Sequence, residues 1–250
     1  MISEWERRNN YWTNTDSPDF VRLTHSITQR NILSMYDSIY KNCFTEEVTM
    51  NPLGKKELLY FYNRHLRDFG DSPQALRWTP EGQHLRYEIL LKIAGDLSGK
   101  KVLDFGCGKG DLYGFIKERE ISLQYCGIDI NENLINLARN KYPEAEFMVV
   151  DIEEAEFDRI FDIIFVCGVF NLRIAGIEES MKNVLKKLFG LSRKAFHVNL
   201  LTYYIPQRNV ELFYVKPEEI LRFVITELSP SVILRHGTIK EDFFLSIYSP

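Results

Sequence analysis

The sequence has few cysteines, and they are scattered. Only four of its 250 residues are cysteine, at Cys43, Cys107, Cys126 and Cys167. No Cys-x-x-Cys pair or close Cys/His spacing occurs, so we expect neither a disulfide framework nor a metal site. We interpret the four residues as reduced, mostly buried thiols.

The chain also lacks an excess of positive charge and a long apolar run. Its formal net charge is -4 at pH 7, its first ten residues are MISEWERRNN, and its longest apolar run is IIFVCGVF. The start has neither the basic residues nor the apolar stretch of a secretory signal, and the run is far too short for a membrane span. We expect a cytoplasmic protein with no membrane partner. Nucleic acid is disfavoured as a partner, although a local basic patch would still allow it.

From Lys101 onward, short apolar runs alternate with segments of helical spacing, which is typical of a parallel α/β sheet. The expected strands are 101–105, 124–129, 145–151, 161–168 and 194–200, and the expected helices are 112–118, 132–141, 178–189 and 216–228. Two last β-like runs, 231–237 and 242–249, are too close together for a parallel crossover. We expect them to pair as an antiparallel hairpin.

The first part of the chain lacks this alternation. Segments 54–70 and 80–99 have helical spacing, with Gly70 and Gly95 near their ends, and the first 45 residues are polar and aromatic with weak periodicity. We predict a helical N-terminal extension or cap at residues 1–97. Residues 98–250 should form a doubly wound α/β domain with a seven-stranded, mostly parallel sheet.

The most informative stretch is VLDFGCGKGD, at the expected carboxyl end of the first strand, where open α/β sheets bind ligands. A dinucleotide-binding loop has the pattern GxGxxG, but the position of its third glycine is Asp111 here and the extra glycine is Gly110. Asp104 and Asp111 would place two carboxylates beside a pyrophosphate, which disfavours a nicotinamide oxidoreductase. A ligand with an ammonium, a sulfonium, ribose and adenine, but no phosphate, removes this conflict.

Residues 100–250 resemble the class I S-adenosylmethionine-dependent methyltransferases, which have a Rossmann-like fold. The acidic residue and alternating glycines of the family's first motif match Asp104, Gly106, Gly108 and Gly110. The acidic residues that end the second strand and follow the third match Asp129 and Asp151. The stretch FDIIFVCGVFN matches the fourth motif, and the final hairpin is also expected of the family.

The resemblance implies that S-adenosylmethionine is the cofactor and S-adenosylhomocysteine its product. Asp104 would order the glycine loop near the ammonium, Asp129 would accept hydrogen bonds from the ribose hydroxyls, and Asp151 would accept one from the adenine amino group. The cofactor-binding residues that it implies are Asp104, Gly106, Cys107, Gly108, Asp129, Ile130, Asp151, Ile152, Cys167 and Gly168.

The methyl acceptor is less well specified. We consider Asn171, Asn199 and Tyr203 as candidates for its pocket because they follow or close the fourth and fifth strands. Methyl transfer from a sulfonium is a direct displacement that depends on alignment, so no catalytic residue is assigned. The motif Asn/Asp-Pro-Pro-aromatic of amino-group DNA methyltransferases is replaced by CGVFN, and no Pro-Cys pair is present for attack on cytosine. His197, inside the fifth strand, is expected to be a core residue.

Two interpretations of Arg86 and Trp78 stay open: Arg86 approaches the methionine carboxylate with Trp78 as a wall, or Arg86 forms an interhelical salt bridge beside a core tryptophan. For the chain as a whole we predict a methyltransferase with a small-molecule acceptor. The alternatives are a protein or RNA methyltransferase and a non-catalytic, S-adenosylmethionine-binding regulatory subunit. Oligomeric state is not predicted.

Overall fold

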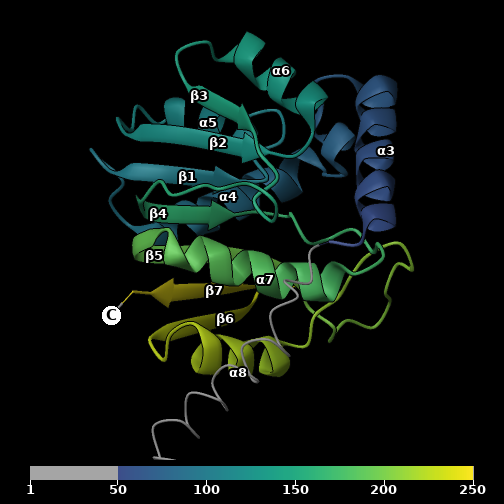
Figure 1. The fold of residues 1–250 in the computed structure, drawn as a ribbon, viewed down its shortest axis with the longest axis vertical. Helices are drawn as coiled ribbons and strands as arrows, with labels where there is room; N and C mark the ends of the chain where they lie inside the picture. The colour runs from purple at the N-terminus through teal and green to yellow at the C-terminus, as the bar shows by residue number, and fades with distance from the viewer. Residues whose placement is uncertain (1–49, 250) are drawn as a thin grey trace, which may run out of the picture. The chain divides into compact units, whose positions relative to one another are not determined.

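A seven-stranded sheet in the order β3-β2-β1-β4-β5-β7-β6 forms the centre of the computed structural model, which describes residues 50–249 (Figure 1). The first five strands pair in parallel, and β7 pairs antiparallel with both β5 and β6. The predicted Rossmann-like fold with a final hairpin is therefore confirmed. The strands are β1 (Lys101–Phe105), β2 (Gln124–Asp129), β3 (Glu146–Val149), β4 (Phe161–Val166), β5 (Ser192–Leu201), β6 (Val232–Ile239) and β7 (Asp242–Tyr248).

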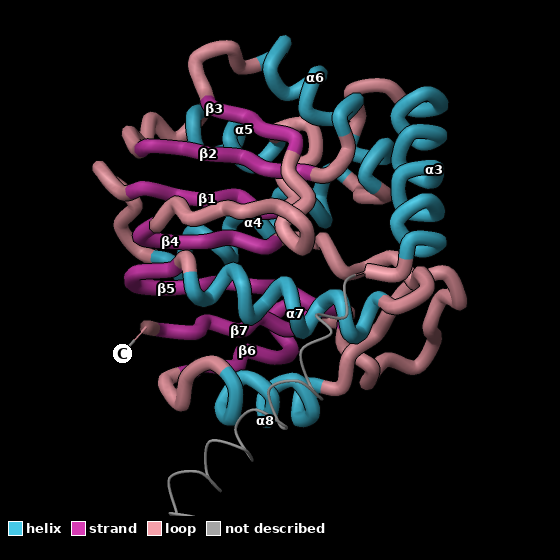
Figure 2. The backbone as a smooth tube through the Cα atoms, in the orientation of Figure 1, coloured by secondary structure: helices cyan, strands magenta, loops and turns pink. Residues whose placement is uncertain are grey.

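The order of the strands creates a crevice. The chain proceeds from β1 through β2 to β3 and then returns to β4 on the other side of β1. The connections that leave β1 and β4 therefore diverge at the carboxyl ends of these strands, which is where doubly wound sheets bind ligands. The loops at these ends gather on the side of the sheet that lies next to α3 (Pro52–Phe69) (Figure 2).

Helices cover both faces of the sheet (Figure 1). Apolar side chains of the helices α4 and α5 pack against β1 and β4 on one face, and those of α7 and α8 pack on the other. Strands covered on both faces are read in sequence as continuous apolar runs, which is why their positions were predictable. The helices after α3 are η1 (Pro73–Leu76), α4 (Pro80–Ala94), α5 (Asp111–Lys117), α6 (Glu132–Lys141), α7 (Ile177–Gly190) and α8 (Pro217–Glu227).

The helical spacing predicted for 54–70 and 80–99 corresponds to α3 and α4, and Gly70 and Gly95 are their C-caps. The helix α3 lies across the carboxyl ends of the parallel strands (Figure 1). The expectation for the first 45 residues lies outside the described part of the chain, and the division at residues 97 and 98 stays a prediction.

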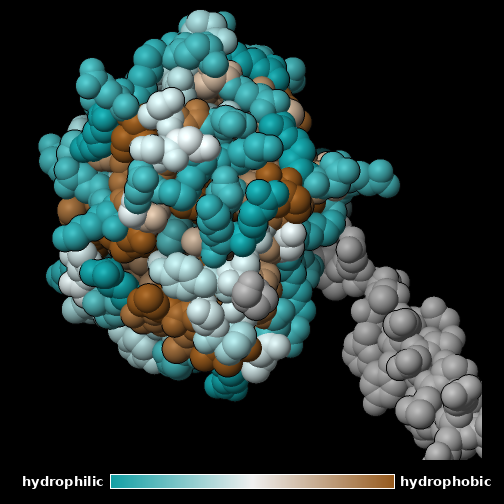
Figure 3. All heavy atoms as spheres, turned by 90° about the vertical axis from the view of Figure 1, so that its left-hand side faces the viewer, coloured by the Kyte–Doolittle hydropathy of each residue, from teal (hydrophilic) through white to brown (hydrophobic). Residues whose placement is uncertain are grey.

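The opposite side of the sheet, where the parallel strands begin, carries hydrophilic residues over most of its area, with hydrophobic residues in separate patches (Figure 3). Asp162 lies at this side, where its carboxylate accepts a hydrogen bond of 3.0 Å from the Lys101 backbone N–H. It therefore aligns two strand ends far from the crevice. Within residues 50–249, every helix is too short or too polar to cross a membrane.

Candidate functional site

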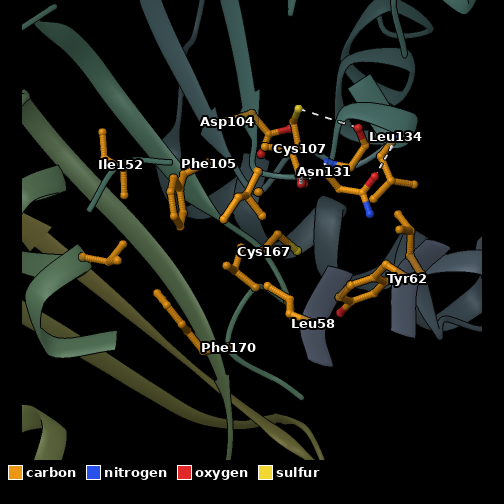
Figure 4. Close-up of a pocket in the computed structure, with 18 of the residues that line it drawn as sticks. Leu58, Tyr62, Asp104, Phe105, Cys107, Asn131, Leu134, Ile152, Cys167 and Phe170 are labelled. Carbon is orange, nitrogen blue, oxygen red and sulfur yellow. Dashed lines mark hydrogen bonds between the residues drawn. The ribbon is translucent and has the colours of Figure 1, made fainter. Parts of the chain in front are cut away.

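A cavity of about 1100 Å³, counted out to its mouth, lies at the carboxyl ends of β1, β2 and β4. Figure 4 shows Leu58 and Tyr62 of α3 on one side of this first cavity and Phe105 and Ile152 on the other. All ten residues predicted to bind the cofactor line it: Asp104, Gly106, Cys107, Gly108, Asp129, Ile130, Asp151, Ile152, Cys167 and Gly168. Their contacts with a cofactor stay a prediction, but the fold brings all of them to one place.

The glycine loop after β1 runs close to its neighbours. Gly106 and Gly108 have φ angles of +69° and +55°. A Cβ atom at Gly106 would lie 2.4 Å from the Val169 side chain, and one at Gly108 would lie 2.9 Å from Leu76. The spacing of glycines in the sequence is thus required by backbone conformation and by close packing, and it leaves the loop backbone as part of the cavity wall.

Asp104 is buried, with an exposed fraction of 3%, and it accepts a 2.6 Å hydrogen bond from the Tyr125 hydroxyl. Burial raises the pKa of Asp104 to about 7, and the negative charges of Asp129 and Asp111 add to the rise, whereas the Tyr125 hydrogen bond opposes it. A positive charge placed beside this carboxyl group would favour its ionised form and lower its pKa again.

Asp129 connects the glycine loop to the end of β2. One carboxylate oxygen accepts from the Gly108 N–H at 2.9 Å, and the other accepts from the Asn131 N–H at 2.8 Å. Burial raises the pKa of Asp129 despite these hydrogen bonds. Each carboxylate oxygen can accept more than one hydrogen bond, so acceptor capacity remains for ligand hydroxyls.

The carboxylate of Asp151 already has a partner on helix α3. It forms an ion pair with Lys55 of α3, and it accepts a 3.1 Å hydrogen bond from the Glu153 N–H. Glu153 also lines the cavity, and burial raises its pKa. The Oε1 atom of Glu153 is buried and has no hydrogen-bond partner within residues 50–249. We did not predict Glu153, since the acidic run DIEEAE cannot show which of its carboxylates faces the cavity.

The charge of the lining decides what kind of ligand fits. Four carboxylates line the first cavity, from Asp104, Asp129, Asp151 and Glu153, and the lining that the structure describes contains no Lys, Arg or His. A phosphate-bearing dinucleotide would meet like charge here. A ligand with an ammonium, a sulfonium and hydroxyl groups matches the set of acceptors.

Three of the four cysteines lie in the described part of the chain, where Cys107 and Cys126 are buried and Cys167 is half-buried. Cys107, Cys126 and Cys167 are free thiols, and burial raises the pKa of each. Residues 50–249 contain no group of three or more side chains that would hold a metal ion. Cys43 lies outside the described residues.

Arg86 forms a buried salt bridge. Its Nε and Nη2 atoms donate to the two carboxylate oxygens of Asp242, each at 2.6 Å, and its Cζ lies 4.4 Å from the centroid of the Trp78 ring. The salt bridge of the second interpretation is observed, although its partner belongs to β7 and not to a helix, and Trp78 is half-buried rather than a core residue. Trp78 does line the first cavity, where a Cβ atom at Gly168 would lie 2.2 Å from its ring.

A second cavity, with about 670 Å³ of empty space out to its mouth, adjoins the first. The residues common to both linings are Tyr62, Leu76, Trp78 and Gly168.

The three acceptor candidates occupy different places. Asn171 lines the second cavity. Asn199 is fully buried behind the wall, where its Oδ1 accepts from the Gly168 N–H at 2.7 Å and its Nδ2 donates to Asp242 at 2.7 Å. Tyr203 lines a separate groove beside α8. The structure therefore brings only Asn171 to a cavity that adjoins the predicted cofactor site.

His197 is a core residue, as expected. It is 1% exposed, its Nδ1 lies 2.9 Å from the Ser246 hydroxyl oxygen, and burial lowers its pKa to about 4. Its imidazole is neutral at physiological pH and lies away from both cavities.

The sequences that this chain resembles are those of methyltransferases. Residues 102–189 match the model of a family described as a methyltransferase domain. One relative is a protein of Invertebrate iridescent virus 6 that is named as a methyltransferase without an assigned substrate. It is 29% identical over 140 residues, which are 53% of this chain and 53% of the viral protein. A second relative named as a methyltransferase, from Mycobacterium tuberculosis, is 28% identical over 155 residues, which are 58% of this chain and 91% of that protein. The chain thus spans about half of the viral relative.

The fold is similar to that of solved methyltransferase structures. One of them is the magnesium protoporphyrin IX methyltransferase of Synechocystis with bound S-adenosylmethionine. It has a TM-score of 0.58 and 16% sequence identity, and the similarity covers 79% of this chain and 97% of that one. At this identity the comparison establishes the fold.

Proposed function

We propose that this chain, whose residues 102–189 match a methyltransferase-domain model, uses S-adenosylmethionine to methylate a small molecule held in the second cavity. The main support for this proposal is that the two cavities adjoin: they share a junction whose residues line both, namely Tyr62, Leu76, Trp78 and Gly168. The second cavity is lined by apolar side chains together with a few polar groups, which is typical of a small-molecule site. An acceptor bound there would lie next to the methionine end of the cofactor.

When bound, S-adenosylmethionine would supply an activated methyl group: the acceptor lone pair bonds to the methyl carbon, the sulfur–methyl bond breaks, and S-adenosylhomocysteine leaves as the neutral thioether. The residues of the chain orient the two reactants. Asp104 would accept from the ammonium and Asp129 from the ribose hydroxyls, while the glycine loop would fix the position of the methionine part. The apolar side chains of Leu76 and Trp78 line the junction of the two cavities and would exclude water from it, so alignment and desolvation would supply the rate enhancement.

Calorimetry tests the cofactor part of this proposal. Wild-type protein should bind S-adenosylhomocysteine and not NAD. Asp129→Ala should weaken binding by at least tenfold, because it removes two loop hydrogen bonds and the acceptors for the ribose. Asp158→Asn, at an exposed aspartate outside both cavities, is the matched control and should bind like wild type. A folded wild-type protein that does not bind S-adenosylhomocysteine would refute the proposal.

The acceptor part is tested with fractionated cell extract. The protein is incubated with S-adenosylmethionine and either the small-molecule filtrate or the retained macromolecules, and the release of S-adenosylhomocysteine is measured. We expect turnover with the filtrate. Turnover only with the retained fraction would favour a protein or RNA acceptor. Binding of the cofactor without turnover in either fraction would favour a regulatory subunit.

A further inference from the structure

Two residues that line the second cavity each carry a buried polar atom without a hydrogen-bond partner within residues 50–249. The two atoms are Nη1 of Arg77, which is a donor, and Oδ1 of Asn171, which is an acceptor. Buried polar groups in folded proteins are nearly always paired. A donor and an acceptor left unpaired on one cavity therefore indicate a ligand that brings the complementary pair.

Arg77 is held firmly in its position. It caps η1 in the left-handed conformation, with φ 64° and ψ 29°, which is uncommon for a residue other than glycine. Its Nη2 donates to Glu211 at 2.8 Å, and its Cζ lies 5.6 Å from the centroid of the Phe61 ring. The guanidinium is thus fixed by an ion pair and a ring, while Nη1 is not used by either contact.

Asn171 is fixed by its backbone. Its carbonyl oxygen accepts from the Phe213 N–H at 2.9 Å, and the next residue, Leu172, pairs with Leu212 in an isolated bridge. The segment that carries these partners also carries Glu211, the ion-pair partner of Arg77. The two unpaired atoms therefore belong to one connected framework, although 94 positions separate the residues in the chain.

The charges around the second cavity disfavour an anionic ligand. Arg86 also lines it, but its three donor nitrogens are occupied by Asp242 and by the Gly82 carbonyl oxygen. The charge of Arg77 is balanced by Glu211. Glu241 adds a further negative charge to the lining. The cavity thus offers a hydrogen-bond donor without an uncompensated positive charge.

We propose that the second cavity binds an uncharged acceptor molecule with two adjacent hydroxyl groups. One hydroxyl oxygen accepts from Nη1 of Arg77, and the other hydroxyl donates to Oδ1 of Asn171. A hydroxyl group both donates and accepts, so a diol satisfies the two atoms with one kind of group. The apolar body of the molecule lies against Tyr62, Leu76 and Trp78. This inference rests on the proposed function, since it assigns the substrate class of the same site.

The test uses three probes with one apolar body: trans-1,2-cyclohexanediol, cyclohexanol and cyclohexanecarboxylate. The full chain is first titrated with S-adenosylhomocysteine, and each probe is then titrated into the loaded protein by ligand-observed NMR. We expect the diol to bind about fivefold more tightly than cyclohexanol, which corresponds to one additional neutral hydrogen bond. The carboxylate should bind more weakly than the diol.

Variants assign the effect to the two residues. Arg77→Met and Asn171→Leu should each remove the advantage of the diol and leave the affinity for cyclohexanol unchanged. Arg64→Met, at an exposed arginine of α3, is the control and should behave like wild type. Glu211→Gln should raise the affinity for the carboxylate, because it leaves the charge of Arg77 unbalanced.

The possible failures are distinct. If the wild-type protein does not bind S-adenosylhomocysteine, the proposed function is refuted, and the inference with it. Equal affinity of the loaded protein for the diol and for cyclohexanol would refute the inference alone. Tighter binding of the carboxylate than of the diol by the loaded wild-type protein would also refute it, in favour of an anionic acceptor.

Discussion

The buried carboxyl group of Asp104 predicts that cofactor affinity depends on pH near neutrality. Its pKa is raised to about 7, chiefly by burial, and no Lys, Arg or His lies in the described lining of the first cavity. In the proposed site the ammonium group of S-adenosylhomocysteine would pair with Asp104 and so favour its ionised form. Binding at pH 6 must therefore release a proton from Asp104, whereas binding at pH 8 does not.

The size of this effect follows from the titration of one group. A carboxyl group with this pKa is about one-tenth ionised at pH 6 and about nine-tenths ionised at pH 8. If only the ionised form pairs with the ammonium, affinity rises about tenfold between these two pH values and changes little above pH 8. The direction is fixed, because raising the pH removes the proton that competes with the ligand.

Calorimetry of S-adenosylhomocysteine binding at pH 6, 7 and 8 measures the dependence. Buffers with different ionisation enthalpies, compared at pH 6.5, report the released proton directly. Asp104→Asn should bind more weakly and lose most of the dependence, while it keeps an acceptor for the Tyr125 hydroxyl. The reasoning would be refuted by a flat profile in wild type, or by an unchanged slope in Asp104→Asn, which would assign the titration to another group such as Asp129.

Two further predictions concern buried charge in the core. Arg86→Met leaves Asp242 charged and without its cation, so it should lower the free energy of unfolding by about 3 to 5 kcal/mol. Adding Asp242→Asn should restore more than half of that loss in urea unfolding, and no recovery would mean that packing of the arginine, not charge, is responsible. His197, with its pKa lowered to about 4, stays neutral when folded but takes up a proton when unfolded below about pH 6.5. Stability should therefore fall by about 2 kcal/mol between pH 7 and pH 4.5 through this residue, and His197→Gln should remove that part of the slope; equal slopes in the two proteins would contradict the assignment.

The strands and the glycine loop were predictable because their signals are local. Lys101–Phe105 and Gln124–Asp129 were predicted with the observed bounds, since buried parallel strands are continuous apolar runs. The third strand ends at Val149, earlier than expected, because the chain turns at Asp151, whose carbonyl oxygen accepts from the N–H groups of Glu154 and Ala155.

Contacts between distant residues could not be predicted in this way. The pairs Arg86–Asp242 and Lys55–Asp151 are separated by 156 and 96 positions, and neither leaves a periodic or local pattern. The short helix η1 was also missed, although it places Arg77 at the second cavity. A single sequence thus located the residues at strand ends, but not the partners that the fold brings to them.

The anchoring of Gly168 determines how much of the chain an engineer must keep. The match to the methyltransferase model ends at residue 189, but the Gly168 N–H is held by Asn199 of β5, which is held in turn by Asp242 of β7. A fragment cut at residue 189 would leave β4 as an unpaired edge, which favours aggregation. It would also lose the anchor of a cavity wall. The smallest transplantable unit with both cavities intact therefore extends from Met50, just before α3, to the end of β7.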